Sequence, residues 1–244
     1  MIKNKKELIV IPTYNEEGNI GSLINEIIEI LPNADIIVID DNSTDNTQEE
    51  INTLIAKHSK RVNLIVRKDI RGLGTAYTTG LLYGLNNGYD HIVTMDADYS
   101  HSPEYLPLIL KTLNECDVVI GSRYIKDGGT VNWRIRRILL SWLANRFASF
   151  IMGLNGTDLT SGYRAYKADI LKKIDFDNIR SNGYSYLVEM LYIIKILNGK
   201  TIDIPIIFFD RTQGKSKISK KEIYRGAFTL FRLRFSKVKA KLNI

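Results

Sequence analysis

The chain has 244 residues, of which 44% are hydrophobic and 25% charged, a composition typical of a globular protein with a substantial buried core. A single cysteine excludes an internal disulfide, and no apolar run reaches the roughly 18 residues that a membrane-spanning helix needs. The formal net charge is +7, and residues 211–244 concentrate it, with 11 Lys and Arg against one acidic residue. Such a basic segment predicts a polyanionic partner, either nucleic acid or an anionic membrane.

The first half of the chain alternates β-rich runs with helical periodicity. We expect strands over residues 7–12, 34–41, 62–68, 91–98 and 116–123. Between them, apolar residues recur at the i, i+3, i+4 spacing of one buried helix face, as in the helix carrying Ile20, Leu23 and Ile27. This rhythm predicts an α/β fold with a mostly parallel, doubly wound sheet.

The second half follows a different plan. We expect a glycine-bearing loop over residues 124–133, helices over 134–152 and 185–197, a strand over 201–211, a polar loop over 212–217 and a basic amphipathic helix over 218–241. Residues 1–217 would then form the main domain, and residues 218–244 a C-terminal segment lying on a membrane.

Two carboxylates close the fourth predicted strand, Asp96 and Asp98. Residues one apart on an extended strand point the same way, so these carboxylates would repel unless a cation lay between them. A hard divalent ion held by few protein oxygens keeps coordination positions free for phosphates. The pair therefore indicates a metal–diphosphate site, although the same pattern also occurs as a solvated turn.

Further candidate ligand-binding residues follow other strands. Tyr14 could supply a wall for a nucleoside base, and Asp41 an acceptor for its N–H groups. Gly72 and Gly74 precede the third predicted helix, where glycine permits close backbone approach. Each residue alone could be an ordinary loop-capping residue. Together at successive strand ends, where open α/β sheets bind ligands, they favour a nucleotide site.

Seven motifs occur in order along the chain: PTYNE, IDDNSTDNT, GLGTAY, MDADYSHSP, GSRY, DLTSGYRAYK and DRTQGKSK. Together they resemble the dolichol-phosphate (polyprenol-phosphate) mannosyltransferases, which are family 2 glycosyltransferases with the GT-A fold. The resemblance covers about residues 8–233. It implies a GT-A (Rossmann-like) sheet followed by C-terminal interfacial helices, GDP-mannose as donor, polyprenyl phosphate as acceptor and Mg²⁺ or Mn²⁺ as cofactor.

The resemblance also implies a set of site residues. Those around the nucleotide sugar would be Pro12, Tyr14, Glu16, Ile39, Asp41, Asp96, Ala97, Asp98, Arg123, Arg211 and Lys217. Asp96 and Asp98 would be metal ligands, with Ser100 at a position where some members carry a metal-contacting glutamine. A serine hydroxyl is shorter, so we expect its contact to run through water.

The proposed acceptor is a phosphate monoester, which is already anionic and needs no general base to attack the sugar. The enzyme must then hold two repelling phosphates together. Arg137 and Ser141 lie four apart on a predicted helix and share a face, so both can reach the acceptor phosphate beside Arg123. We expect Asp98, Arg123 and Arg137 to be catalytic, and a single displacement to invert the anomeric carbon.

A polyprenyl acceptor lies in a bilayer, so membrane association is expected without a spanning helix. The segments 134–152 and 218–241 mix bulky apolar residues with Lys and Arg, a pattern typical of interfacial helices. Packing of the first segment on the sheet is an equal alternative. We expect a peripheral protein on the cytoplasmic face of a membrane. A small membrane-spanning anchor subunit would be compatible with such binding.

Two rival functions stay open at the level of the sequence. The first keeps the chemistry but changes the donor, for example to UDP-glucose, and nucleotide competition would separate the two. The second is a non-catalytic nucleic-acid-binding protein that uses the basic tail. The aliphatic content of that tail and the lack of a recognisable nucleic-acid motif argue against the second, and we expect no nucleic-acid partner.

Overall fold

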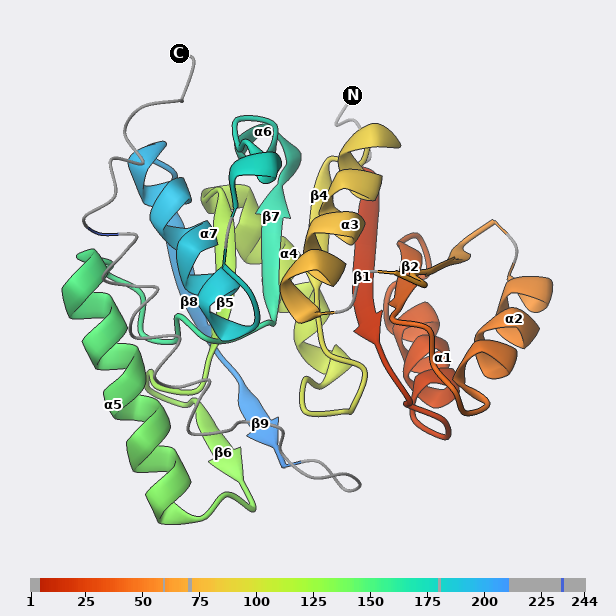
Figure 1. Ribbon diagram of the computed structural model, residues 1–244, viewed down its shortest axis with the longest axis horizontal. Helices are drawn as coiled ribbons and strands as arrows, with labels where there is room; N and C mark the ends of the chain where they lie inside the picture. The colour runs from red at the N-terminus through yellow and green to blue at the C-terminus, as the bar shows by residue number, and fades with distance from the viewer. Residues whose placement is uncertain (1–4, 59, 70–71, 180, 211–233, 235–244) are drawn as a thin grey trace.

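The computed structural model describes residues 5–58, 60–69, 72–179, 181–210 and 234. Its centre is a seven-stranded sheet in the order β3-β2-β1-β4-β7-β5-β8 (Figure 1). The strands are β1 (Glu7–Thr13), β2 (Asp35–Asp40), β3 (Val62–Val66), β4 (His91–Thr94), β5 (Val118–Ser122), β7 (Arg164–Lys167) and β8 (Thr201–Pro205). All neighbours in this sheet are parallel except β7, which runs antiparallel to both β4 and β5.

Helices cover both faces of the sheet, because the strands are apolar on both sides. One face packs against α1 (Ile20–Ile30), α2 (Thr47–Lys57) and α4 (Leu106–Thr112). The other packs against α3 (Leu73–Asn86), α5 (Ile135–Met152), α6 (Ala168–Leu171) and α7 (Tyr184–Ile196). Short 3₁₀ turns lie at Pro103–Tyr105, Leu113–Glu115 and Phe176–Asn178. The expected doubly wound α/β architecture is confirmed.

A separate two-stranded parallel ribbon pairs β6 (Gly129–Val131) with β9 (Ile207–Phe209). Figure 1 shows this ribbon at the lower edge of the molecule, beside the start of α5 and near the carboxyl ends of the parallel strands. Ligand crevices of open α/β sheets lie at that edge.

Four expectations about elements need correction. The strand expected over 91–98 ends at Thr94, since the chain turns through Tyr99, whose φ is 59°. The strand expected over 201–211 is two strands in two sheets, β8 and β9. The loop expected over 124–133 contains β6, and β7 was not expected at all. The expected loop 212–217, the domain boundary at 217 and the basic C-terminal helix lie, apart from Arg234, outside the described residues.

Candidate active site

The acidic pair lies in the loop that follows β4, so its two side chains are not aligned by a strand as expected. Asp98 is 5% exposed, and its Oδ1 accepts hydrogen bonds from the backbone N–H of Ser100 at 3.1 Å and from the Ser100 hydroxyl at 2.5 Å. The buried Ser100 thereby orients the Asp98 carboxylate. Hydrogen bonds to the ionised form of a carboxyl favour that form, which is the form a metal ion binds.

Asp96 is held by two aromatic residues that face it from other segments. The Tyr77 hydroxyl on α3 donates to Asp96 Oδ1 at 2.9 Å, and the Asp96 backbone N–H donates to His101 Nδ1 at 3.0 Å. Burial and then the Asp96 carboxylate raise the pKa of Tyr77 well above its ordinary value, so the phenol stays a donor. Burial lowers the pKa of His101, although Asp96 and Asp98 act in the opposite direction. His101 therefore accepts as a neutral imidazole.

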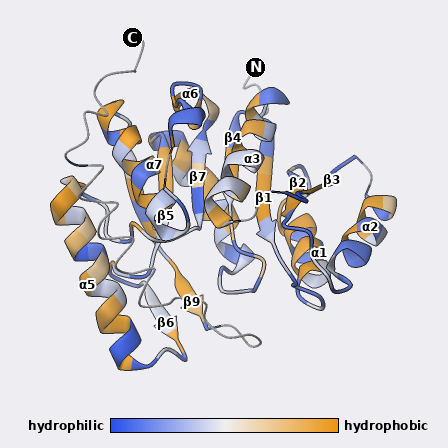
Figure 2. Ribbon diagram, viewed as in Figure 1, coloured by the Kyte–Doolittle hydropathy of each residue, from blue (hydrophilic) through white to orange (hydrophobic). Residues whose placement is uncertain are grey.

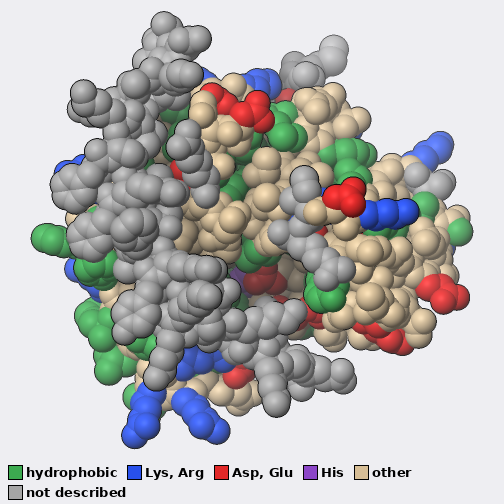
Figure 3. All heavy atoms as spheres, in the orientation of Figure 1, with side chains coloured by type: hydrophobic (Ala, Val, Ile, Leu, Met, Phe, Trp, Pro, Cys, Tyr) green, Lys and Arg blue, Asp and Glu red, His purple; other side chains and the backbone are tan. Residues whose placement is uncertain are grey.

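The acidic loop borders a cavity of about 110 Å³. Its lining is Pro12, Glu16, Leu73, Tyr77, Asp96, Ala97, Asp98, Thr160, Gly162, Tyr184 and Leu187. Figure 3 shows acidic side chains and a histidine in a hollow near the middle of this face. Five of the expected nucleotide-sugar residues, from β1 and from the loop after β4, are thus gathered around one space.

The chemistry of this cavity suits a hard divalent cation. Asp96 and Asp98 both line it, and carboxylate oxygens are the ligands that Mg²⁺ and Mn²⁺ prefer. Among the described residues, no three His, Cys, Asp or Glu side chains form a closed metal cage. A site with two protein carboxylates leaves coordination positions that phosphate oxygens can fill.

Asp41 lies at the end of β2, but its carboxylate is engaged by protein groups. Its Oδ1 accepts from Arg67, with Nε at 2.8 Å and Nη2 in a second contact, and its Oδ2 accepts from the Gly72 N–H at 2.8 Å. Arg67 also donates to the Thr75 hydroxyl at 2.9 Å. Gly72 adopts φ 132°, which an L side chain rarely does. The Asp41–Arg67 pair thereby holds Gly72 and Thr75 at the start of α3, a role that sequence reasoning missed.

A larger cavity of about 490 Å³ adjoins this pair, on the side of α3 that carries Thr75, Thr78 and Thr79. Arg67 and Tyr186 also line it. Tyr14 is half-buried at the end of β1, whereas the Ile39 side chain is fully buried in the core. Ile39 lies inside β2 between Pro12 and Ile65, so its expected contact with the nucleotide sugar stays a prediction.

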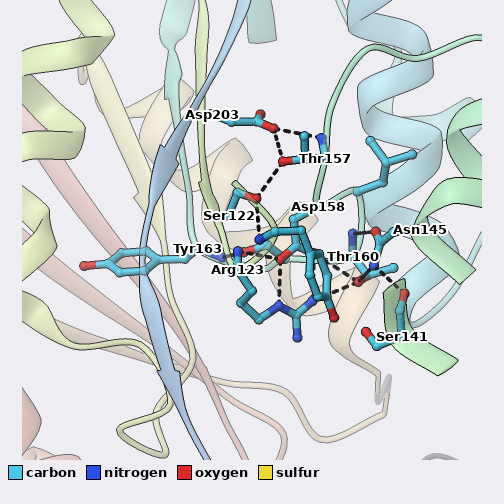
Figure 4. Close-up of polar contacts among 12 residues, drawn as sticks. Ser122, Arg123, Ser141, Asn145, Thr157, Asp158, Thr160, Tyr163 and Asp203 are labelled. Atoms are coloured by element: carbon cyan, nitrogen blue, oxygen red, sulfur yellow. Dashed lines mark hydrogen bonds and ion pairs between the residues drawn. The ribbon is translucent and has the colours of Figure 1, made fainter. Parts of the chain in front are cut away.

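Arg123 follows β5 and forms a buried ion pair with Asp158 (Figure 4). Arg123 Nε and Nη2 contact the two Asp158 oxygens at 2.6 and 2.7 Å, and Nη2 also reaches the Thr160 hydroxyl at 3.1 Å. Burial alone would lower the pKa of Arg123, but Asp158 raises it by more, so the guanidinium stays charged. Among the described residues, the side-chain hydrogen bonds of Arg123 engage Nε and Nη2, which leaves Nη1 for a further anion.

Arg137 and Ser141 lie on α5 as expected, one turn apart. Arg137 Nη1 contacts Asp210 Oδ1 at 2.7 Å, and both side chains are about one third exposed. Asn145, one turn after Ser141, donates to the Thr160 hydroxyl at 3.2 Å and accepts from the Thr160 N–H at 3.2 Å. Thr160 also lines the small cavity that the acidic loop borders, and its hydroxyl connects α5 with Arg123 (Figure 4). Arg211 and Lys217 lie outside the described residues.

Sequence reasoning named several of these site residues but missed the side chains that hold them by hydrogen bonds. Asp158 and Thr160 belong to the motif DLTSGYRAYK, and Tyr77 to GLGTAY, so the signal was present but unassigned. Glu189 on α7 is buried and accepts from the Ser181 N–H at 2.9 Å, which gives it a structural role.

An α/β sheet with an acidic loop at its carboxyl edge defines a GT-A glycosyltransferase fold, and solved structures agree. Glucosyl-3-phosphoglycerate synthase from Mycobacterium tuberculosis, crystallised with Mn²⁺, UDP and phosphoglyceric acid, superposes with a TM-score of 0.68 over 95% of this chain and 78% of its own. The two sequences are 17% identical, so this likeness concerns the fold.

The chain belongs to glycosyl transferase family 2, whose model matches residues 8–175. It is 41% identical to undecaprenyl-phosphate mannosyltransferase from Micrococcus luteus, over 87% of both chains. It is 38% identical to polyprenol monophosphomannose synthase from Mycolicibacterium smegmatis, over 92% of this chain and 85% of that one. The family resemblance seen in the sequence motifs is confirmed.

Proposed function

We propose that this protein transfers mannose from GDP-mannose to a polyprenyl phosphate, with inversion, giving a polyprenyl β-mannosyl phosphate and GDP. The observation that carries the proposal is the two-sided site, in which an acidic loop and Arg123 are joined through Thr160. An acidic loop suits the diphosphate of a nucleotide sugar with its cation, and arginine suits an acceptor phosphate. We infer mannose as the sugar and a polyprenyl phosphate as its acceptor from the two relatives, a mannosyltransferase and a phosphomannose synthase.

On the donor side, Asp96 and Asp98 would hold Mg²⁺ or Mn²⁺, which supplies Lewis-acid stabilisation of the departing diphosphate. Ser100 keeps the Asp98 carboxylate oriented through two hydrogen bonds. Tyr77 does the same for Asp96. Preorganised groups of this kind need not rearrange when charge develops in the transition state.

On the acceptor side, the phosphate monoester is its own nucleophile, so no residue has to remove a proton. Arg123 and Arg137 would bind this phosphate and reduce its repulsion from the diphosphate. Ser141, one turn after Arg137 on α5, offers a hydroxyl to the same group. The buried Asp158 keeps Arg123 at a fixed place and orientation.

We further propose that α5 rests on the cytoplasmic face of the membrane that holds the acceptor. Its outer face carries large exposed apolar residues: Ile135, Leu139, Leu140, Trp142, Leu143, Phe147 and Phe150. Figure 2 colours much of the α5 ribbon as hydrophobic, and Figure 3 shows hydrophobic side chains along the edge where α5 lies. Among the described residues, no helix is long and apolar enough to span a bilayer. A membrane-spanning anchor subunit would add to this peripheral binding.

The test is incorporation of labelled mannose from GDP-mannose into polyprenyl phosphate in detergent and in anionic vesicles, with Mg²⁺, Mn²⁺ or chelator. Asp98→Ala should lower kcat/KM by on the order of 10²–10³-fold, the usual effect of losing one preorganised electrostatic group. Asp169→Ala, whose side chain is 87% exposed, is the matched control and should retain full activity.

UDP-glucose in parallel reactions tests the donor. Product from UDP-glucose and none from GDP-mannose would show that the donor is a UDP-sugar, while transfer to polyprenyl phosphate would still hold. Absence of product with either donor, in detergent and vesicles alike, would refute the proposed transfer.

A further inference from the structure

Trp133 lies between β6 and α5 and contacts both arginines proposed for the acceptor phosphate. The guanidinium carbon of Arg137 is 3.8 Å from the centroid of the Trp133 ring, and that of Arg123 is 5.2 Å from it. These arginines come from different parts of the fold, one from α5 and one from the end of β5. Because both distances are measured to the same ring centroid, the two guanidinium carbons lie no farther apart than the sum of these distances.

Two guanidinium groups at such separation repel each other, so the protein must hold them together. Among the described residues, Asp158 is the acidic partner of Arg123 and Asp210 that of Arg137. The face of an indole ring carries negative electrostatic potential and attracts a cation within about 6 Å of its centroid. Trp133 therefore stabilises both arginines at once without neutralising their charge, which a carboxylate in the same place would do.

A polar atom of Trp133 is also available at this position. Its indole Nε1 is buried, and no residue that the structure describes accepts a hydrogen bond from it. A buried donor without an acceptor is costly unless a ligand satisfies it. The combination of two fixed cations and one N–H donor is the chemistry that recognises a phosphate.

The ring is itself fixed by packing that leads back to the acidic loop. Trp133 meets Phe208 of β9 edge to face, with centroids 5.3 Å apart. Phe208 in turn meets His101 at 5.5 Å, and His101 accepts the N–H of Asp96. The β6–β9 ribbon thus provides a continuous aromatic connection between the donor-side loop and the acceptor-side arginines.

We propose that Trp133 is the positioning residue of the acceptor site: it holds Arg123 and Arg137 at the spacing that binds one phosphate monoester. This inference rests on the proposed function, in which those arginines bind the acceptor. Trp133 acts through the arginines and has no role in donor binding.

Steady-state kinetics with each substrate varied in turn test this assignment. Trp133→Leu removes the ring and should raise KM for polyprenyl phosphate roughly tenfold, as expected for loss of two cation–π contacts, while KM for GDP-mannose stays within about twofold. Trp133→Phe keeps a ring but loses the indole N–H, so it should recover part of the acceptor affinity. Asp169→Ala, whose side chain is 87% exposed and lies outside the proposed site, is the control and should leave both KM values unchanged. Unchanged acceptor KM in Trp133→Leu, or an equal rise in both KM values, would overturn the proposal.

A binding measurement decides the matter independently of turnover. The chain has two tryptophans, so Trp142→Phe leaves Trp133 as the only one. Titration of this variant with water-soluble farnesyl phosphate should change Trp133 emission saturably, and Arg137→Ala in the same background should abolish the change. A flat titration would refute the assignment of Trp133. A saturable one in a protein that transfers no sugar would refute the proposed function and retain the phosphate site.

Discussion

The half of the molecule built from β1–β4 and the half built from β5–β9 place their functional residues by different means. In the first half, parallel strands buried on both faces end at one edge, and the loops after β1 and β4 bring Pro12, Glu16, Asp96 and Asp98 around one cavity. Apolar packing there sets where the strands end, and hydrogen bonds from Ser100 and Tyr77 orient the two carboxylates.

In the second half, hydrogen-bonded networks position the side chains. Arg123, Asp158, Thr160 and Asn145 connect a strand end, a loop and α5 through side-chain contacts (Figure 4). The antiparallel β7 contributes the fully buried Arg164, which donates to the carbonyls of Leu187 and Leu159 at 2.7 Å. Stability of this half should therefore depend on single polar contacts, while the first half should be sensitive to changes in volume.

The largest expected effect is loss of the buried ion pair. Asp158→Ala leaves the Arg123 charge buried without its carboxylate and should lower the free energy of unfolding by about 3–5 kcal/mol. Asp210→Ala removes a partly exposed partner of Arg137 and should cost only about 0–1 kcal/mol. Urea denaturation of both variants measures the difference. Equal losses of unfolding free energy in the two variants would show that the buried Arg123–Asp158 pair stabilises the fold no more than the partly exposed Arg137–Asp210 pair.

The hydrogen bond between Tyr77 and Asp96 should matter for activity. Tyr77→Phe removes a hydroxyl 2.9 Å from a site carboxylate and should lower kcat/KM by roughly tenfold or more, since hydrogen bonds to charged groups are worth about 1.5–3 kcal/mol. Tyr89→Phe is the matched control, because its hydroxyl donates to Asp35 at 2.8 Å. Asp35 begins β2, at the opposite end of that strand from Asp41. Similar losses in the two variants would mean that Tyr77 affects folding alone.

Sequence patterns predicted the first half well because its elements are set locally. Each expected strand from 7–12 to 62–68 matches a strand of the sheet within two residues at either end. The helix that was expected to carry Ile20 and Ile27 is α1. The acidic pair was also found, since a D-x-D closing an apolar run is visible in the chain. Only the extent of β4 was wrong, because the turn at Tyr99 depends on a left-handed φ that sequence periodicity does not report.

The second half was harder because its structure depends on partners distant in sequence. β7 is only four residues long, RAYK, and it forms a strand by inserting between β4 and β5. Residues 201–209 form one apolar run, yet β8 pairs with β5 and β9 with β6. Likewise, the sequence predicted Arg123 and Arg137 as phosphate ligands, which stays a prediction, but it could not indicate their contacts with Asp158, Asp210 and Trp133.

Tolerance of added volume should also distinguish the two halves. A Cβ on Gly80 of α3 would lie 2.1 Å from Val10 Cγ1, so Gly80→Ala should cost about 1–3 kcal/mol through overpacking. A Cβ on Gly129 of β6 would meet Ile207 Cδ1 at an ordinary 3.5 Å, so Gly129→Ala should change stability by less than about 0.5 kcal/mol. Thermal and urea unfolding measure both. If Gly129→Ala lost more unfolding free energy than Gly80→Ala, the first half would not be the part of the molecule more sensitive to added volume.

The smallest expected effect on folding concerns the outer face of α5. Ile135 and Phe150 are 82% and 84% exposed, so replacing both with serine should change the free energy of unfolding by less than about 0.5 kcal/mol. The same variant should bind anionic vesicles at least tenfold more weakly, because burying each side chain in lipid is worth about 1.5–3 kcal/mol. Leu108→Ser on α4, across the sheet, is the control and should bind vesicles as before. Vesicle binding that survives the double substitution but is lost at high salt would mean that charge holds this protein on the membrane, and that the apolar face of α5 does not.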